Sequence, residues 1–234
     1  MKGSTDFVLV SCEHGGNLVP GRYARLFRRR QRLLQSHRGW DAGALLLARE
    51  LAAGLNARLE AATTTRLLVD LNRSPRHPGL FSICTRDLDP AEKRHILERW
   101  YLPYRNAVEN AVASALKKHR RVIHLSIHSF TPALDGEERH ADVSLLYDPA
   151  RSGELAFSSR VLEELSRREP HKCLRRNYPY RGTADGLTTH LRKRFPKHRY
   201  LGIEVEVNQR HAALKGPKWA GLRRSIRDSI GASI

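Results

Sequence analysis

Two histidines and one carboxylate are the residues of this sequence best suited to hold a metal ion. His14 follows the apolar segment Phe7 to Ser11, and His128 follows Val122 to Ile127, so each lies at the carboxyl end of an expected strand. Ligands of open α/β sheets bind outside these strand ends. Asp41 stands at the head of an expected helix. Two histidines and a carboxylate that leave a fourth position open for water are typical of hydrolytic zinc, which lowers the pKa of that water towards neutrality.

The carboxylate ligand has two candidates, Asp41 and Glu13, and Asp41 is favoured. Adjacent residues of an extended segment point in opposite directions, so Glu13 and His14 do not easily bind one ion together. Asp41 also suits the N-cap of the helix that follows it. The sequence leaves its role open between capping and metal binding.

Polar residues that suit substrate binding surround a second apolar segment. Leu67 to Leu71 is an expected strand, with Arg66 before it and Asn72 and Arg73 after it. A guanidinium group can bind a substrate carboxylate in a bidentate manner, and a second one can stabilise a developing oxyanion. Asp70 has a simpler alternative role as the ion-pair partner of an arginine. Ser129, next to His128, is a further candidate for substrate binding.

Two glutamates lie on one face of an otherwise apolar strand near the end of the chain. The segment Gly202 to Asn208 carries Glu204 and Glu206 two positions apart. A carboxylate in such surroundings is costly unless it is paired or functional, and a raised pKa there suits a general base. We expect Glu206 to be the base and Glu204 to be the buried partner of an arginine.

The elements that position these residues alternate between short β-branched runs and longer helical patterns, which predicts an α/β layered domain. We expect one domain over residues 1–234. Asp89, Pro90 and Glu92 predict a helix start, and Pro103 should kink or divide that helix before it resumes towards Lys118. The segments 74–87 and 130–142 are candidate substrate loops. Further strands are expected at Ser144 to Tyr147 and Tyr200 to Val207, and further helices at Asp41 to Leu59, Glu154 to Arg168 and Trp219 to Ile230.

Composition narrows the class of protein. At 234 residues and 40% hydrophobic content, the chain can bury one substantial core. It contains no run of about 18 apolar residues and no signal-peptide pattern, so we expect a cytoplasmic protein without a membrane span. Three scattered cysteines, Cys12, Cys84 and Cys173, indicate reduced thiols.

The charge is strongly positive, with 42 Lys and Arg against 24 Asp and Glu, which gives +18. Such a chain attracts phosphates or acidic substrates. The basic residues are spread over many segments, and aromatic residues, at 7%, do not interleave with them as base stacking requires. This pattern favours solvated helix faces over a nucleic-acid-binding surface.

Five segments together resemble the N-formylglutamate amidohydrolase family. They are Ser11 to Asn17, His37 to Gly43, Arg66 to Arg73, Ile127 to Pro132 and Ile203 to Gln209. The resemblance implies an α/β/α sandwich with a mixed, mostly parallel sheet, of the zinc-carboxypeptidase and aspartoacylase type. It also implies a zinc-dependent hydrolase whose substrate is a small acidic N-acyl amino acid such as N-formylglutamate.

The resemblance assigns roles at the matching positions. It implies zinc binding by His14 and His128, binding of a substrate carboxylate by Asn72 and Arg73, and polarisation of the scissile carbonyl by Arg66. The base would be the glutamate beside Val205. The His-x-x-Glu ligand pair of zinc carboxypeptidases would need a glutamate at position 17, where this chain has asparagine. The third ligand therefore stays open between Asp41 and Glu13.

Two other functions compete with this one. The first is an amidase that acts on a peptide or γ-glutamyl bond, which a panel of substrates distinguishes. The second is a non-catalytic anion- or nucleic-acid-binding protein that keeps the fold. Stoichiometric zinc, with loss of activity on chelation, separates both enzymes from the binding protein.

Overall fold

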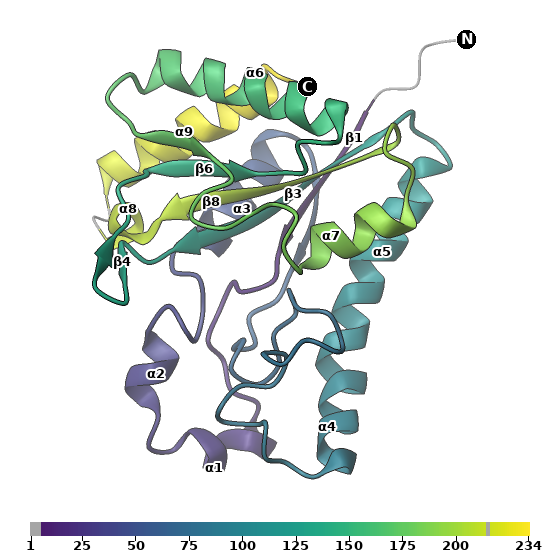
Figure 1. The fold of residues 1–234 in the computed structure, drawn as a ribbon, viewed down its shortest axis with the longest axis vertical. Helices are drawn as coiled ribbons and strands as arrows, with labels where there is room; N and C mark the ends of the chain where they lie inside the picture. Colours follow the sequence, from purple (N-terminus) through teal and green to yellow (C-terminus); the bar gives the residue numbers. More distant parts are fainter. Residues whose placement is uncertain (1–5, 214–215) are drawn as a thin grey trace.

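The structure, a computed structural model, describes residues 6–213 and 216–234. Its centre is a six-stranded sheet with the strand order β2-β1-β3-β8-β6-β7 (Figure 1). The pairs β1/β2, β1/β3, β3/β8 and β6/β7 are parallel, and β6 runs antiparallel to β8, so the sheet is mixed and mostly parallel. A short hairpin of two strands, β4 and β5, forms a separate sheet. The strands are β1 (Phe7–Cys12), β2 (Arg58–Ala61), β3 (Val122–Phe130), β4 (Ala133–Leu134), β5 (Glu137–Glu138), β6 (Val143–Leu146), β7 (Leu174–Arg176) and β8 (Tyr200–Asn208).

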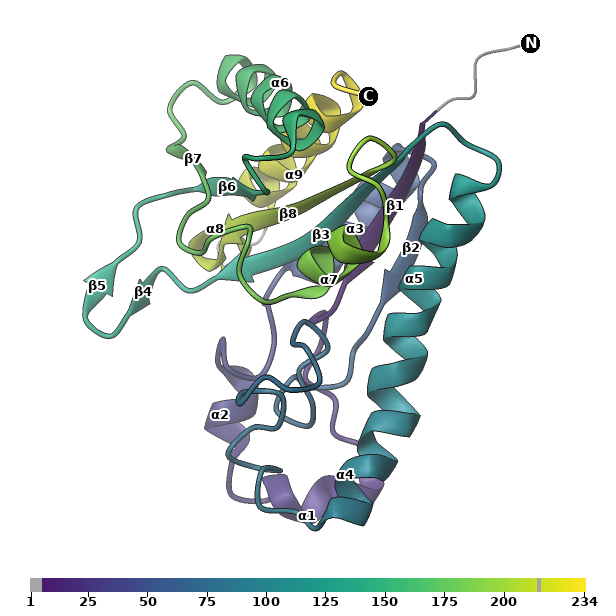
Figure 2. The same cartoon turned by 45° about the vertical axis from the view of Figure 1, so that its right-hand side comes forward.

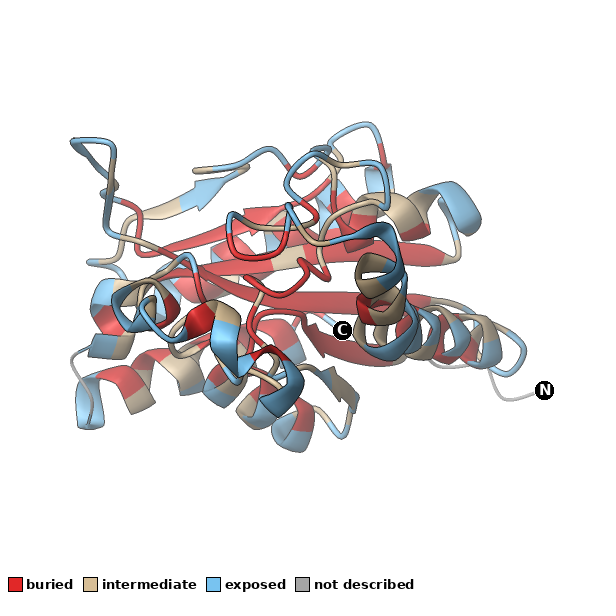
Figure 3. Cartoon of the chain, turned by 90° about the horizontal axis from the view of Figure 1, so that it is seen from below, coloured by how far each residue is buried: buried red, intermediate tan, exposed pale blue. Residues whose placement is uncertain are grey.

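Helices cover both faces of the sheet, which confirms the predicted three-layer arrangement. The described helices are η1 (Gly21–Tyr23), α1 (Ala24–Phe27), α2 (Gln31–Gln35), α3 (Ala44–Gly54), α4 (Pro90–Ile96), η2 (Leu97–Tyr101), α5 (Leu102–Leu116), α6 (Ser152–Arg168), α7 (Leu187–Arg194), α8 (Gln209–Ala213) and α9 (Pro217–Gly231). One face packs against α3, α6 and α9, and the opposite face packs against α5 and α7 (Figures 1 and 2). Figure 3 shows that buried residues concentrate along the strands and on the inward sides of the helices.

The apolar segment Leu67 to Leu71 is not a strand, contrary to the prediction. Its backbone forms local turns, with Leu68 N bonded to Thr65 O at 3.0 Å and Arg73 N bonded to Asp70 O at 3.2 Å. The segment is apolar because it fills a second core below the sheet, with Phe27 of α1 and Ile96 of α4 among its neighbours. The strand that pairs with β1 on this side is β2 instead.

The helix predicted over Asp41 to Leu59 is shorter than expected. It is α3, which ends at Gly54. Asn56 then adopts a left-handed conformation, with φ of 48°, and turns the chain into β2, where Leu59 lies. An asparagine in this conformation is a common helix stop.

The predicted start of the next helix is confirmed. Asp89 is the N-cap of α4 and its side chain accepts a hydrogen bond from the Glu92 amide, with Pro90 in the first turn. The π-helical segment η2 divides α4 from α5 just before Pro103, so the expected interruption is also present. Across the described ranges 6–213 and 216–234, none of the helices has the length and apolar character needed to cross a membrane.

Candidate active site

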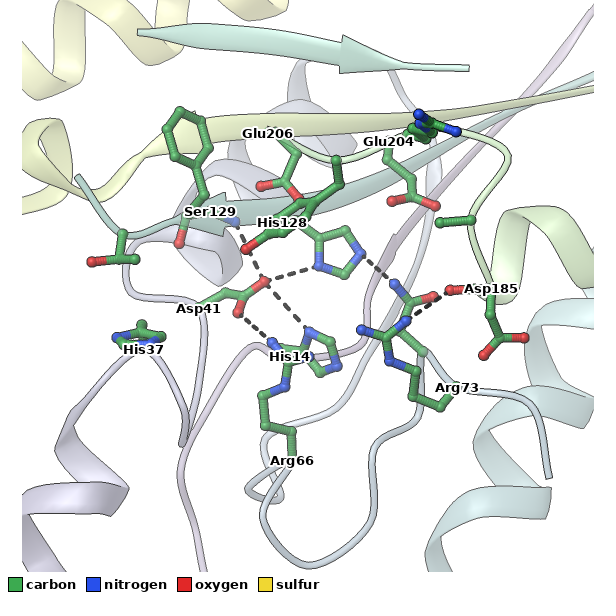
Figure 4. Close-up of a pocket in the computed structure, with 16 residues that line it drawn as sticks. His14, His37, Asp41, Arg66, Arg73, His128, Ser129, Asp185, Glu204 and Glu206 are labelled. Carbon is green, nitrogen blue, oxygen red and sulfur yellow. Dashed lines mark hydrogen bonds and ion pairs between the residues drawn. The ribbon is translucent and has the colours of Figure 1, made fainter. Parts of the chain in front are cut away.

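A cavity of about 210 Å³ opens where the carboxyl ends of β1, β3 and β8 meet (Figure 4). It is lined by every residue that the sequence favoured for a site role, whereas Glu13, the alternative ligand, does not line it. The favoured residues are His14, Asp41, Arg66, Asn72, Arg73, His128, Ser129 and Glu206. The structure therefore brings the whole predicted set together, and the roles of its members stay predictions.

Three buried side chains form a set of the size that one metal ion needs. The Oδ2 atom of Asp41 lies 2.9 Å from His128 Nδ1 and 3.4 Å from His14 Nδ1. The three ligand atoms lie within 4.8 Å of one another. Ligand atoms bound about 2.1 Å from a tetrahedral zinc ion would be separated by roughly 3.4 Å. The Nδ1 atom of His14 is also buried without a hydrogen-bond partner among the described residues, which a metal ion would remedy.

The backbone around His14 explains the two glycines that follow it. A side chain on Gly16 would lie 2.6 Å from the carbonyl oxygen of Thr63, and one on Gly15 would lie 2.8 Å from that of Ala62. This close approach turns the chain at the end of β1 and leaves His14 at the cavity. The carbonyl oxygen of His14 then accepts a hydrogen bond from the Asp41 amide at 2.9 Å, which brings the two proposed ligands together.

Asp41 does not cap the helix that follows it. The N-cap of α3 is Gly43, with φ of 82° and no capping side chain, and the carboxylate of Asp41 faces the two histidines instead. The capping interpretation of Asp41 is therefore wrong. Burial alone would raise the pKa of Asp41, but His14, His128 and Arg66 outweigh it and hold that pKa well below its usual range.

Each of the two histidines also contacts a further carboxylate through its Nε2 atom. Asp70 Oδ1 lies 2.7 Å from His14 Nε2, and Glu13 Oε2 lies 3.0 Å from His128 Nε2. Both rings thus turn Nδ1 towards Asp41. Glu13 faces the side of His128 that points away from the three-ligand set, so the geometry favours Asp41 over Glu13 as the third ligand. Asn17 is not a substitute, because its side chain donates to the carbonyl oxygen of Leu34 at 3.1 Å.

The carboxylates beside His128 raise its pKa. Burial alone would lower the pKa of His128, but its hydrogen bonds to Asp41 and Glu13 raise that pKa well above its usual value. A metal ion bound at Nδ1 would compete with a proton there, as metal binding to histidine generally does.

Arg66 is fixed at the wall of the cavity by two carboxylates. Its Nη2 donates to Asp70 Oδ2 at 2.7 Å and its Nη1 donates to Asp41 Oδ1 at 3.3 Å. Asp70 therefore pairs with an arginine, as the alternative interpretation expected, and it holds His14 as well. The side chain of Arg66 is about one-quarter exposed, which leaves part of the guanidinium open to the cavity.

Asn72 and Arg73 come from the turn segment after Asp70, and a loop that the sequence did not single out holds them. The Oδ1 atom of Asn72 accepts a hydrogen bond from the amide of Leu187 at 2.6 Å. Nη1 of Arg73 donates to the carbonyl oxygen of Asp185 at 3.1 Å. The segment 177–187 thus forms the far wall of the cavity.

This loop was missed because it follows no expected strand and carries no metal-ligand spacing. Its Tyr180, Arg181 and Asp185 also line the cavity. Gly182 is the one signal that could have marked it, since a side chain there would lie 2.2 Å from the amide nitrogen of Tyr147. Ser129, on the other wall, donates its hydroxyl to the carbonyl oxygen of Ala42 at 2.8 Å.

The two strand glutamates differ in their partners. Glu204 accepts a hydrogen bond from the hydroxyl of Thr188 at 2.6 Å, so its partner is a threonine rather than the arginine that we expected. Glu206 is 5% exposed, and its Oε2 is buried without a hydrogen-bond partner among the described residues. Burial, followed by the negative charges of Asp41 and Glu204, raises the pKa of Glu206 to about 8.

Comparison with known proteins agrees with this site. The sequence model of N-formylglutamate amidohydrolases matches residues 7–212. The chain belongs to the N-formylglutamate amidohydrolase family. The predicted resemblance is confirmed, and the family is one of amide hydrolases. No curated protein sequence matches the chain significantly.

Solved structures share the fold of this N-formylglutamate amidohydrolase family member. A gene product from Agrobacterium tumefaciens is 28% identical, with a TM-score of 0.81 over 99% of this chain and 90% of that one. The N-formylglutamate amidohydrolase from Ralstonia eutropha is 21% identical, with a TM-score of 0.71 over 99% of this chain and 93% of that one.

Proposed function

We propose that this protein hydrolyses the amide bond of a small acidic N-acyl amino acid, such as N-formylglutamate, with zinc bound by His14, Asp41 and His128. The observation that carries the proposal is the buried Nδ1 atom of His14, which has no hydrogen-bond partner among the described residues and lies within 4.8 Å of ligand atoms of Asp41 and His128. When bound there, zinc would supply the Lewis acidity that activates water for attack on an amide.

The cavity walls supply groups for an acidic substrate. Arg73, braced by Asp185, is suited to bind the carboxylate of the amino acid, with the side-chain amide of Asn72 beside it. Arg66, locked between Asp41 and Asp70, is suited to stabilise the charge that develops on the acyl oxygen. Ser129 lines the same cavity and is a further substrate contact in this proposal. The cavity volume of about 210 Å³ suits a small molecule.

Glu206 is suited to carry the proton. In our proposal it accepts a proton from the attacking water, and it returns that proton to the amine nitrogen when the carbon–nitrogen bond breaks. Its Oε2 has no partner among the described residues, so the carboxylate is available for this exchange. The pKa of Glu206 is about 8 without metal, and a nearby cation would lower that pKa towards the range of an effective base.

Amide hydrolysis by metal-free and zinc-reconstituted protein tests this function. We expect formate release from N-formylglutamate by the zinc form, loss of activity on chelation and recovery when zinc returns. N-acetylglutamate, N-formylleucine and a γ-glutamyl dipeptide form the comparison panel. Fastest turnover of the γ-glutamyl dipeptide would favour the alternative amidase. Full activity in the metal-free protein would contradict the proposal.

A further inference from the structure

We propose that Glu13 is a positioning residue, which fixes the ring of His128 so that Nδ1 is the metal-binding atom. This inference rests on the proposed zinc function and adds a residue to which the sequence gave only the role of an alternative ligand. Glu13 is fully buried, at 0% exposure, and it lies at Nε2 of His128, whereas Asp41 lies at Nδ1.

The carboxylate of Glu13 is held from three directions. Its Oε2 lies 3.0 Å from His128 Nε2 and accepts a hydrogen bond from the Ser126 hydroxyl at 2.7 Å. Its Oε1 accepts a hydrogen bond from the Tyr104 hydroxyl of α5 at 3.0 Å. The residue is thus anchored to β3 and to the long helix at once, and it cannot follow the ring if the ring rotates.

The neighbours of Nε2 show why a carboxylate is needed at this position. The Ser126 hydroxyl lies 3.0 Å from Nε2, and the side-chain amide nitrogen of Asn72 lies 3.4 Å from it. Both groups can donate a hydrogen bond. Without Glu13 they would favour the tautomer of His128 in which Nε2 is unprotonated and Nδ1 carries the proton. A carboxylate only accepts hydrogen bonds, so Glu13 retains the proton on Nε2 and leaves the Nδ1 lone pair free for the metal.

Glu13 also offers a cleaner test than the carboxylate behind the other histidine. Asp70 holds His14 but also forms the ion pair with Arg66, so its replacement would disturb a proposed substrate contact. Among the described residues, Glu13 forms an ion pair with His128 and with no arginine. Replacing Glu13 therefore addresses the orientation of one ligand.

Zinc affinity, measured by competition with a chelator, is the first readout. We expect Glu13→Gln to bind zinc about 10- to 100-fold more weakly than the wild type, the usual effect of losing the outer partner of a metal-binding histidine. Tyr104→Phe is the matched control, because it removes a hydrogen bond from the other oxygen of the same carboxylate. It should lower the melting temperature of the metal-free protein and leave zinc affinity close to that of the wild type.

Nitrogen NMR of labelled histidines in the cadmium-substituted wild type is the second readout, which does not depend on a variant that folds. We expect coupling of cadmium to His128 Nδ1 and a retained proton on Nε2. Coupling to Nε2, or equal zinc affinities of Glu13→Gln and the wild type, would overturn the role of Glu13 alone. A wild type that binds no stoichiometric zinc would overturn the proposed function, and this inference with it.

Discussion

His128 and Glu206 occupy paired positions on the parallel strands β3 and β8, so the two side chains emerge next to each other at the cavity. The preceding pair on the same face is Ser126 with Glu204. Glu206 is therefore the glutamate beside a proposed metal ligand, and Glu204 lies one step further back along the strand. This register favours Glu206 as the base.

Glu206→Gln should keep the fold and the bound zinc while lowering kcat by about 100-fold or more, the usual scale for loss of a positioned general base. The amide keeps the size of the side chain but cannot accept the proton from water. The measurement is kcat for the best substrate of the panel, together with zinc content.

Glu204→Gln is the control for this variant. It keeps a hydrogen-bond acceptor for Thr188 and should lower kcat much less. If Glu204→Gln is the inactive variant and Glu206→Gln is active, the two glutamates have exchanged roles. Activity in both variants would exclude a glutamate base.

The stability of the metal-free protein should depend on the ionisation of Glu206. Its pKa is about 8 in the folded protein, against a reference value of 4.5, so the folded state retains a proton that the unfolded chain has lost between these values. The free energy of unfolding should therefore fall as the pH rises through this window. The melting temperature of wild type minus that of Glu206→Gln should decrease from about pH 5 to about pH 8. A constant difference would contradict the raised pKa.

Arg73→Lys should raise KM on the order of tenfold, although the charge is kept. An ammonium group cannot reproduce the planar fork that can bind a carboxylate while Asp185 holds one of its nitrogen atoms. Steady-state kinetics with an N-acyl amino acid, and with the matching amino-acid amide as the neutral control, measure the effect. With the amide, the Arg73→Lys substitution should raise KM far less than with the acid. An unchanged KM for the acid would remove Arg73 from carboxylate binding.

The sequence allowed the carboxyl ends of β1, β3 and β8 to be predicted well, because these strands are almost entirely buried and rich in apolar residues. Placement of His14, His128 and Glu206 follows directly from such segments. The same reasoning failed at Leu67 to Leu71, where equally apolar residues fill a second core from a segment of turns. Local hydrophobicity reports burial but does not distinguish a strand from a buried loop.

The strand β2 was missed for the opposite reason. Arg58–Ala61 lies at the edge of the sheet and is only partly buried, so its sequence lacks an apolar run. The wall formed by 177–187 was missed because its contacts with Asn72 and Arg73 join residues more than a hundred positions apart. Such contacts depend on the tertiary fold, and the spacing of residues along the chain does not predict them.

We propose above all that one zinc ion binds between His14, Asp41 and His128 in an amide hydrolase. Anomalous diffraction at the zinc edge, from crystals of the zinc-loaded protein, tests it most directly. We predict one strong peak about 2.0–2.2 Å from Nδ1 of each histidine and from a carboxylate oxygen of Asp41. No peak in the cavity, or a peak bound to Glu13 instead of Asp41, would contradict it.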